Sequence, residues 1–395
     1  MPRLPAPGTA RRQGSEQVLR LAFVLYKYFP YGGLQRDFLR IAGNAMARGH
    51  RVTVLTTAWE GESPAGLDIR LLPARGWSNH RRMLHFATDV STALNTSGPW
   101  DAVVGFNKLP GLDLYYAADP CYAAAIDDGK PAWYRLTGRY RSYAQLERAV
   151  FAPQATTRIL LIAEPELARF QASYDTPSER FVLLPPGIAR DRVAGTDADR
   201  VRAQTRAAMR LEADQLLLLQ VGSAFRTKGV DRSLHAVAGL PEEVKRRVHL
   251  MVAGRGEPAP LLRLAKRLDI DSRVTFLGAR DDVPQLLLAA DLLVHPARTE
   301  NTGTVLLEAM AAGLPVLTTA NCGYSSHVLA GQAGRVASVP FNQERFNQLL
   351  FDMLSSSELQ EWGRSGLAYA RTTDIYSMPE RAVDAIETVA GELRR

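Results

Sequence analysis

Short apolar segments alternate with amphipathic segments along most of this chain. The first unit shows the pattern: Leu21–Tyr26 is apolar throughout, apolar residues recur at helical spacing over 34–45, and Val52–Thr56 is the next apolar run. A fully apolar run is typical of a strand buried on both faces, and the 3.6-residue spacing is typical of a helix. Together they predict a strand–helix–strand unit of about thirty residues with parallel strands.

Two halves of the chain show this alternation, and a polar, charged segment over 188–213 separates them. Strands that alternate with helices predict parallel sheets covered by helices. We therefore predict an α/β fold of two doubly wound, Rossmann-like domains facing each other across a cleft, with ligands bound beyond the carboxyl ends of the strands. The remaining predicted strands are Ala102–Phe106, Leu112–Ala117, Arg158–Ala163, Phe181–Leu184, Leu216–Val221, Val248–Ala253, Val274–Leu277, Leu292–His295 and Pro315–Thr319.

The chain length agrees with this organisation, because 395 residues leave room for two domains of about 150 residues each. We predict an N-terminal domain over 18–190, a C-terminal domain over 191–373 and a last helical segment over 374–395. Residues 1–17 mix Pro, Gly, Arg and Gln without the apolar stretch of a signal peptide. We interpret them as a disordered leader or a misplaced start.

Composition excludes several classes of protein. Hydrophobic residues make up 46% and charged residues 23% of the chain, which excludes a disordered or fibrous protein. The net charge of +7, from 48 Lys and Arg against 41 Asp and Glu, favours acidic partners such as phosphates or an anionic membrane surface. Cys121 and Cys322 have no metal-type spacing, and no apolar stretch reaches the roughly 18 residues of a membrane span. A soluble protein in the reducing cytoplasm is expected.

An acidic residue inside an apolar helix marks the first candidate site. Glu308 lies within the apolar segment 305–312, and a turn of small residues with an acidic start, Glu300–Thr304, precedes it. A helix edge that contacts solvent or a neighbouring Arg is the structural alternative. The free N–H groups at the start of a helix, however, form an anion site suited to a diphosphate. Glu300 and Glu308 would then bind the hydroxyl groups of a sugar and a ribose attached to that diphosphate.

A second candidate anion site follows the strand at 216–221. The loop over 222–229 carries Arg226 and Lys228 between glycines, but its spacing is not that of a Walker A loop. The dinucleotide fingerprint GxGxxG is also absent here and after the first strand, which disfavours a nicotinamide oxidoreductase. In the first half, Asp37 lies in the first turn of the predicted helix. It either compensates the helix dipole or faces the cleft beside a reacting sugar.

Basic and aromatic residues interleave over 130–143. Such a surface suits anionic lipid headgroups or phosphorylated glycans. A nucleic-acid surface and a solvated helix face are the alternatives, and we favour contact with an anionic membrane or glycolipid over nucleic acid. The candidate contact residues are Lys130, Trp133, Tyr134, Arg135, Arg139 and Arg141.

These motifs resemble a known family. Glu300 and Glu308 form an E-x7-E motif, and with the loop of Lys228 they resemble the donor site of glycosyltransferase family 4, whose members are retaining enzymes of GT-B fold. Longer segments resemble the lipopolysaccharide core glucosyltransferases of Gram-negative bacteria, from about Leu19 to near the C-terminus. The segments that carry this resemblance are Leu25–Asp37, Trp59–Gly61, Gly105–Lys108, Pro110–Asp113 and Leu184–Ile188.

The resemblance implies that glucose is transferred from UDP-glucose to an inner-core heptose of lipopolysaccharide, at the inner face of the cytoplasmic membrane. It further implies that the N-terminal domain binds the acceptor, that the C-terminal domain binds the nucleotide sugar, and that the last helix crosses back onto the first domain. The implied donor ligands are Gly33 (diphosphate), Asp37 (transferred sugar), Arg192 and Lys228 (phosphates), Arg280 and Asp281 (uracil), Glu300 (glucose hydroxyls), Thr302, Gly303 and Thr304 (N–H groups) and Glu308 (ribose).

The sequence departs from the family at two positions. Many members carry Arg where Ser223 stands and a basic residue where Thr227 stands, and Arg226 is the candidate to supply the missing cation. Because UDP leaves with developing negative charge, two cations and a helix N-terminus are expected to stabilise it without a metal or cofactor. Same-face attack and a covalent intermediate on Asp37 both stay open. A family 4 enzyme with another donor or glycolipid acceptor and a non-catalytic glycan- or membrane-binding protein are the alternatives.

Overall fold

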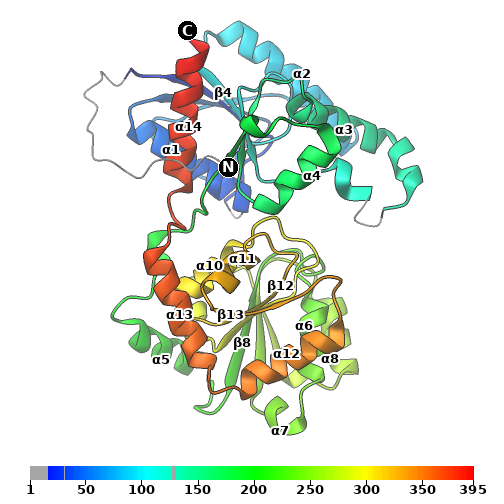
Figure 1. Cartoon of the computed structure of the whole chain (residues 1–395), viewed down its shortest axis with the longest axis vertical. Helices are drawn as coiled ribbons and strands as arrows, with labels where there is room; N and C mark the ends of the chain where they lie inside the picture. The colour runs from blue at the N-terminus through cyan, green and yellow to red at the C-terminus, as the bar shows by residue number, and fades with distance from the viewer. Residues whose placement is uncertain (1–16, 31, 127–129) are drawn as a thin grey trace.

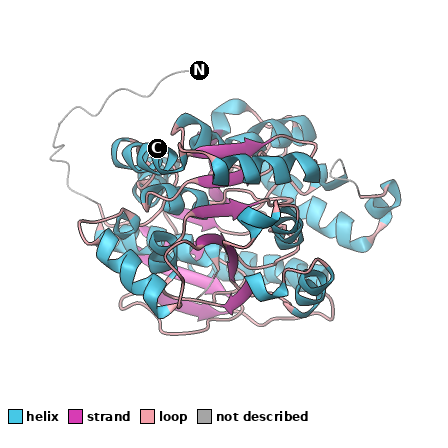
Figure 2. Ribbon diagram, turned by 90° about the horizontal axis from the view of Figure 1, so that it is seen from below, coloured by secondary structure: helices cyan, strands magenta, loops and turns pink. Residues whose placement is uncertain are grey.

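The computed structural model describes residues 17–30, 32–126 and 130–395, and it contains two parallel β-sheets (Figure 1). Residues 1–16 of the predicted leader lie outside the described residues. Helices lie on both sides of the strands (Figure 2). The predicted α/β architecture of two doubly wound domains is therefore confirmed.

The N-terminal sheet has seven strands in the order β3-β2-β1-β4-β5-β6-β7. Leu21 on β1 pairs with Val52 on β2 and with Ala102 on β4, so the first strand lies inside the sheet and is buried on both faces. The elements are β1 (Arg20–Val24), α1 (Gly33–Ala47), β2 (Arg51–Thr56), β3 (Asp68–Leu71), α2 (Asn79–Ser97), β4 (Ala102–Gly105), β5 (Leu114–Ala117), η1 (Ala123–Ile126), η2 (Ala132–Leu136), α3 (Gly138–Phe151), β6 (Arg158–Leu161), α4 (Glu164–Tyr174), η3 (Ser178–Arg180) and β7 (Phe181–Leu183).

The C-terminal sheet has six strands in the order β10-β9-β8-β11-β12-β13. Its elements are η4 (Arg190–Arg192), α5 (Ala198–Ala208), β8 (Leu216–Val221), α6 (Val230–Ala238), α7 (Glu242–Lys245), β9 (Val248–Ala253), α8 (Ala259–Arg267), η5 (Asp271–Arg273), β10 (Val274–Gly278), α9 (Val283–Ala289), β11 (Leu292–His295), α10 (Thr304–Ala311), β12 (Val316–Thr319), α11 (Ser325–Ala330), β13 (Gly334–Ala337), α12 (Gln343–Ser355) and α13 (Leu359–Thr372).

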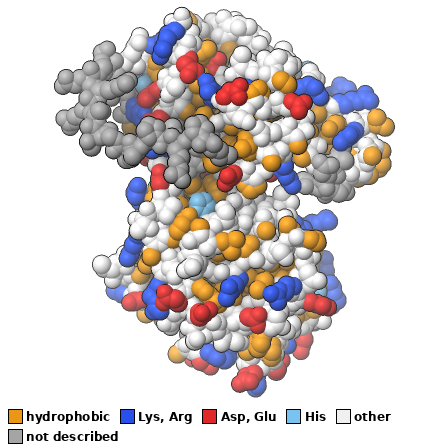
Figure 3. All heavy atoms as spheres, in the orientation of Figure 1, with side chains coloured by type: hydrophobic (Ala, Val, Ile, Leu, Met, Phe, Trp, Pro, Cys, Tyr) orange, Lys and Arg blue, Asp and Glu red, His pale blue; other side chains and the backbone are white. Residues whose placement is uncertain are grey.

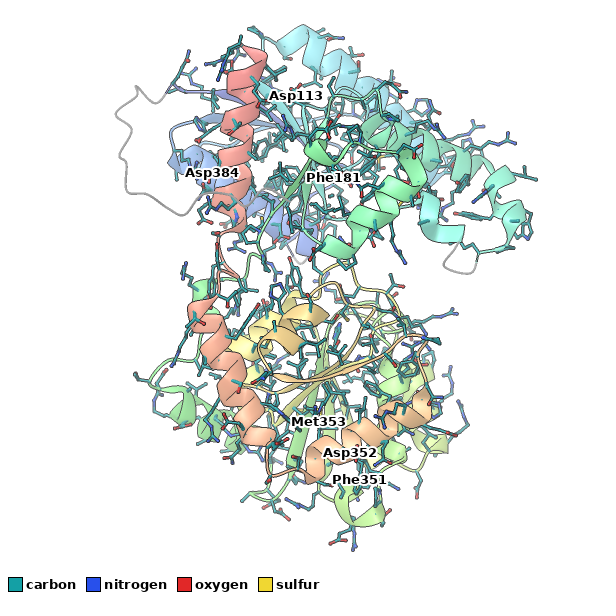
Figure 4. The ribbon with its side chains drawn as sticks, in the orientation of Figure 1. Asp113, Phe181, Phe351, Asp352, Met353 and Asp384 are labelled. Carbon is teal, nitrogen blue, oxygen red and sulfur yellow. The ribbon has the colours of Figure 1, made fainter. Side chains whose placement is uncertain are left out.

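The last helix, α14 (Met378–Leu393), leaves the C-terminal domain and packs along α1 of the N-terminal domain (Figure 1). Its buried face, including Ile386, joins the core around Phe38. At its exposed side, Asp384 (Figure 4) accepts a hydrogen bond from Arg48 at 2.8 Å. The predicted crossing of the last helix back onto the first domain is therefore confirmed.

The two domains meet through the loops that follow the carboxyl ends of their strands. Asn301, after β11, donates to the carbonyl oxygen of Ala118, after β5, at 2.5 Å. A cavity of about 740 Å³ lies between the domains, and Ile162 from one and Tyr324 from the other line it. The edge at which parallel sheets bind their ligands is thus shared by both domains.

Candidate functional site

Glu300 and Lys228 are the charged centre of the C-terminal side of this interface. The carboxylate of Glu300 forms an ion pair with the ammonium group of Lys228, and both side chains are largely buried. The backbone around Glu300 is fixed as well, because its N–H donates to Asn321 at 3.2 Å and its carbonyl oxygen accepts from Gly323 at 3.1 Å. The structure therefore brings together two residues that are 72 positions apart in the sequence.

The loop after β8 presents Lys228 because glycines allow it to fold tightly. Gly222 has a φ of +147°, and a Cβ atom there would lie 3.1 Å from the Cε atom of Lys228. The amide of Gln220 donates to the backbone carbonyl oxygen of Lys228 at 2.8 Å. Burial lowers the pKa of Lys228 from its ordinary value. A lysine held in this way is a positioned cation with little water around it.

His295, the last residue of β11, lies on the other side of Glu300. Its Nε2 atom is 3.4 Å from the Glu300 carboxylate, and its side chain is fully buried. Burial, followed by the charge of Lys228, lowers the pKa of His295 to about 3. The imidazole is therefore neutral at physiological pH and adds no positive charge to the site.

The start of α10 provides backbone N–H groups beside this charged centre. Gly303 has a φ of +84° and immediately precedes the helix, a conformation that glycine adopts without strain. The first N–H groups of an α-helix have no partner within it, and the N-terminus carries partial positive charge. Glu308, one turn further, is only 9% exposed. Thr302, Gly303 and Thr304 thus form the turn that leads into α10, with Glu308 one turn further, and their role in anion binding stays a prediction.

Asp37 approaches from the N-terminal domain. Tyr116, on β5, donates a hydrogen bond to its carboxylate at 2.9 Å. Burial raises the pKa of Asp37, although the charges of Arg36 and Arg40 and the hydrogen bond from Tyr116 lower it. Gly33, the first residue of α1, is exposed four positions earlier. The start of α1 therefore carries both of the donor ligands predicted in this domain.

Arg36 connects the two halves of the site. Its guanidinium group donates to the hydroxyl group of Thr304 at 3.3 Å and lies 3.8 Å from the carboxylate of Glu308. The negative charge of Glu308 in turn raises the pKa of Asp37. Asp37, Arg36 and Glu308 are therefore electrostatic neighbours although they belong to different domains.

The other predicted donor residues lie outside this cluster. Arg280 is bound by both carboxylate oxygens of Asp282, at 2.8 and 2.5 Å, and this pairing raises the pKa of Arg280. Asp281 and Arg226 are exposed at the surfaces of their loops. Arg192, in η4, has its Nε atom 3.5 Å from the carboxylate of Asp191. Over 17–30, 32–126 and 130–395, these four residues form no hydrogen bond or ion pair with Lys228, Glu300 or Glu308.

Sequence reasoning missed four residues of the site, which are Arg36, Tyr116, His295 and Asn301. Tyr116 lies in a predicted strand, and only its partner Asp37 marks it as more than a core residue. Arg36 and Asn301 make their contacts across the domain interface, and such contacts between distant residues cannot be predicted from the spacing of residues in the sequence. The rule that ligands gather at carboxyl strand ends was the available signal, since Tyr116 and Asn301 both lie close to such ends.

The basic and aromatic segment forms η2 and the start of α3, at the edge of the N-terminal domain. The side chains of Trp133 and Leu136 are 64% and 70% exposed. Tyr134 makes two contacts: its hydroxyl group hydrogen-bonds to that of Tyr122 at 2.7 Å, and the ammonium group of Lys130 lies over its ring, 4.7 Å from the ring centre. Arg135, Arg139 and Arg141 are exposed.

Comparison with known proteins assigns the family. A sequence model of the family "Glycosyl transferases group 1" matches residues 201–365. The chain is 46% identical to the lipopolysaccharide glucosyltransferase WaaG of Escherichia coli K12 over 367 residues, which are 93% of this chain and 98% of that protein.

Solved structures agree with this similarity. The crystal structure of WaaG, "a glycosyltransferase involved in lipopolysaccharide biosynthesis", superposes with a TM-score of 0.88, over 93% of this chain and 99% of that one. The structure of Anabaena Alr3699/HepE in complex with UDP-glucose superposes with a TM-score of 0.71 at 17% identity, over 94% and 100% of the two chains, which shows the common fold. The predicted GT-B fold is confirmed, and the chain belongs to the group 1 glycosyl transferases, in the same family as the lipopolysaccharide glucosyltransferase WaaG.

Proposed function

We propose that this chain is a retaining glycosyltransferase that moves glucose from UDP-glucose to an inner-core heptose of lipopolysaccharide. The observation that carries the proposal is the 46% identity to the lipopolysaccharide glucosyltransferase WaaG over 93% of the chain, which covers both domains and the loops between them. The geometry supports it, because a buried cation, a helix N-terminus and two carboxylates converge beyond the carboxyl ends of the strands.

Stabilisation of the departing diphosphate is the main task of these residues. As the bond between the sugar and the diphosphate breaks, negative charge develops on the phosphate oxygens and positive charge on the sugar. Lys228 and the N–H groups of Thr302, Gly303 and Thr304 are fixed where they offset the negative charge. When the donor binds, Glu300 leaves its ion pair with Lys228 and accepts hydrogen bonds from the hydroxyl groups of the sugar. Glu308 likewise leaves Arg36 and accepts hydrogen bonds from the hydroxyl groups of the ribose.

Asp37 faces the transferred sugar from the other domain in this proposal. In a covalent route its carboxylate is the nucleophile, whereas same-face attack requires only its negative charge near the developing positive charge of the sugar. Gly33 approaches the diphosphate through its backbone. Arg192 and Arg226 add positive charge, and Arg280 and Asp281 lie near the uracil.

A donor screen tests this function. We expect rapid transfer to a lipopolysaccharide acceptor truncated at the inner core from radiolabelled UDP-glucose, and little from UDP-galactose, GDP-mannose or ADP-heptose. Each donor is assayed both in EDTA and with added magnesium or manganese, and we expect equal rates because the proposed donor site uses no metal or other cofactor. Preference for another donor would identify a different family 4 enzyme. A requirement for added magnesium or manganese would contradict the metal-free site.

We further propose that the protein contacts an anionic membrane surface at the inner face of the cytoplasmic membrane, where it meets its acceptor, and that nucleic acid is not a partner. Among the described residues, no helix combines the length and apolar character that crossing a membrane requires. The contact surface is instead formed by the basic and aromatic segment, where Lys and Arg side chains gather with hydrophobic ones at the edge of the N-terminal domain (Figure 3).

A second segment extends this surface. Trp77, just before α2, is 76% exposed, and the guanidinium group of Arg81 lies 4.9 Å from its ring centre. The start of α2 is close to the start of α3, because a Cβ atom on Gly138 would lie 3.8 Å from the ring of His80. Exposed tryptophans between basic residues are typical of proteins that lie at a membrane interface.

We expect the combined changes Trp133→Ser, Arg135→Gln and Arg141→Gln to weaken binding to vesicles of anionic lipid by about tenfold or more, because each basic residue near such a surface contributes about 1 kcal/mol. Sedimentation with vesicles measures this. Arg364→Gln, in an exposed ion pair of the C-terminal domain, is the control. Equal sedimentation of the variant and the unchanged protein would refute the membrane surface.

A further inference from the structure

A separate cavity of about 370 Å³ opens in the N-terminal domain, beyond the carboxyl ends of β4 and β5. Its volume is within the range of about 300–1,000 Å³ that small-molecule sites occupy. The residues that line it and matter here are Asn107, Asp119, Tyr122, Lys130, Arg139 and Tyr143. Parallel sheets bind their ligands at this edge, so the position itself suits a binding site.

Lys108 also lines the cavity, but an ion pair within the protein already occupies its ammonium group. Its ammonium group lies 2.6 Å from a carboxylate oxygen of Glu147, whose side chain is fully buried. Glu147 also accepts hydrogen bonds from the backbone N–H groups of Tyr122, at 2.7 Å, and Ala123, at 2.8 Å. This ion pair therefore fixes the loop that forms one wall of the cavity.

Two other cations remain available to a ligand. The ammonium group of Lys130 lies over the rings of Tyr122 and Tyr134, and the guanidinium group of Arg139 lies 6.0 Å from the ring centre of Tyr143. In the part of the chain that the structure describes, neither Lys130 nor Arg139 has a carboxylate within ion-pair distance. Contact with an aromatic face leaves their N–H groups free to donate to an anion.

The cavity adjoins the reaction centre. Asp119, in its lining, directly follows Ala118, whose carbonyl oxygen accepts the hydrogen bond from Asn301, the neighbour of Glu300. Two residues before Ala118, Tyr116 donates to Asp37. The same short segment thus contacts both halves of the donor site and the cavity.

We propose that this cavity is an acceptor subsite that binds an anionic sugar next to the one that receives glucose. The recognised group is a phosphate ester or a carboxylate, bound by Lys130 and Arg139 through charge-assisted hydrogen bonds. The rings of Tyr122 and Tyr143 flank the sugar. The oxygen of Asn107 accepts from the N–H group of Tyr26 at 2.7 Å, and its amide nitrogen, which has no hydrogen-bond partner among the described residues, donates to a hydroxyl group. This inference rests on the proposed transfer to a lipopolysaccharide acceptor.

The test uses a water-soluble acceptor, truncated at the inner core and freed of its fatty acyl chains, so that membrane binding does not contribute. We expect the combined changes Lys130→Gln and Arg139→Gln to raise the KM for this acceptor by about tenfold or more, since hydrogen bonds to charged groups are strong. The KM for UDP-glucose and the kcat at saturating acceptor stay unchanged. Arg148→Gln, an exposed arginine on the same helix outside the cavity lining, is the matched control.

Removal of the phosphate esters with aqueous hydrofluoric acid identifies the anion. If phosphate is recognised, its removal raises the acceptor KM of the unchanged protein by the same factor as the two substitutions do. If a carboxylate is recognised, the difference in acceptor KM between the unchanged protein and the variant remains. Calorimetry of acceptor binding without donor measures the affinity independently of transfer. Equal affinity of the variant and the unchanged protein overturns the subsite, whereas absence of glucose transfer by the unchanged protein contradicts the proposed function.

Discussion

Replacement of Lys228 by alanine is expected to lower kcat for glucose transfer by about a thousandfold, because one fixed donor at a developing negative charge contributes about 10²–10³ in rate. The structure adds a second cause. Glu300 loses its ion-pair partner, and its carboxylate then repels the departing diphosphate. Initial rates with UDP-glucose, at saturating acceptor, measure the effect.

The controls separate this loss of rate from loss of fold. Lys228→Met keeps most of the apolar stem that packs beside Gly222, so a similar loss of rate with a thermal midpoint close to that of the unchanged protein isolates the charge. Lys245→Ala removes a lysine from the surface pair with Glu242 in the same domain and is expected to leave transfer unchanged. Turnover of Lys228→Met near that of the unchanged protein would refute the role of Lys228.

The fold could be predicted because buried parallel strands are apolar at nearly every position. Leu216–Val221 and Val248–Ala253 were predicted with the bounds that the structure shows. Two strands were missed, β3 and β13. β3 is a four-residue edge strand with the polar pattern Asp-Ile-Arg-Leu, and β13 is equally short and begins with Gly334. Edge strands lack the two apolar faces on which such a prediction depends.

The candidate site was only partly predictable. Glu308 stood out because a carboxylate inside an apolar helix requires a polar partner, and the structure supplies Arg36. That partner belongs to the other domain. Local sequence patterns do not predict how the two domains are oriented relative to each other, so they could not identify Arg36. The same reason hides Asn301, whose partner Ala118 offers a backbone carbonyl oxygen without any distinguishing side chain.

Local pairing explains why some predicted residues have other contacts in the structure. The resemblance assigns Arg280 to the uracil, but Asp282, two residues later, binds one edge of its guanidinium group with both carboxylate oxygens. The pairing lowers the pKa of Asp282, so its carboxylate is ionised and the ion pair is retained at physiological pH. An arginine in this geometry keeps a fixed orientation, and its role toward the donor stays a prediction.

Asp37→Asn is the second change with a large expected effect, and here activity and stability are expected to move in opposite directions. The amide cannot act as a nucleophile or stabilise positive charge on the sugar, so transfer is expected to fall by about a hundredfold or more. The amide oxygen still accepts the hydrogen bond from Tyr116 and needs no ionisation in a buried place. The variant is therefore expected to unfold at a higher temperature than the unchanged protein at pH 7.

The pH dependence of this stability difference follows from the raised pKa of Asp37. Between the unfolded pKa of about 3.9 and the raised folded pKa, the native state binds more protons than the unfolded state. The stability of the unchanged protein therefore falls, relative to the variant, as the pH rises through this window. We expect the difference in thermal midpoint between Asp37→Asn and the unchanged protein to be largest above the folded pKa of Asp37 and to decrease toward pH 4.

The matched control is Asp113→Asn, a second carboxyl whose pKa is raised by burial, at the amino end of β5 and away from the site (Figure 4). Its oxygen accepts from the N–H group of Val103 at 2.8 Å, which an amide oxygen also does. We expect Asp113→Asn to keep full transfer. If Asp37→Asn transferred glucose as fast as Asp113→Asn, the placement of Asp37 beside the reacting sugar would be wrong. A lower thermal midpoint for Asp37→Asn at pH 7 would show instead that its charge stabilises the fold through Arg36 and Arg40.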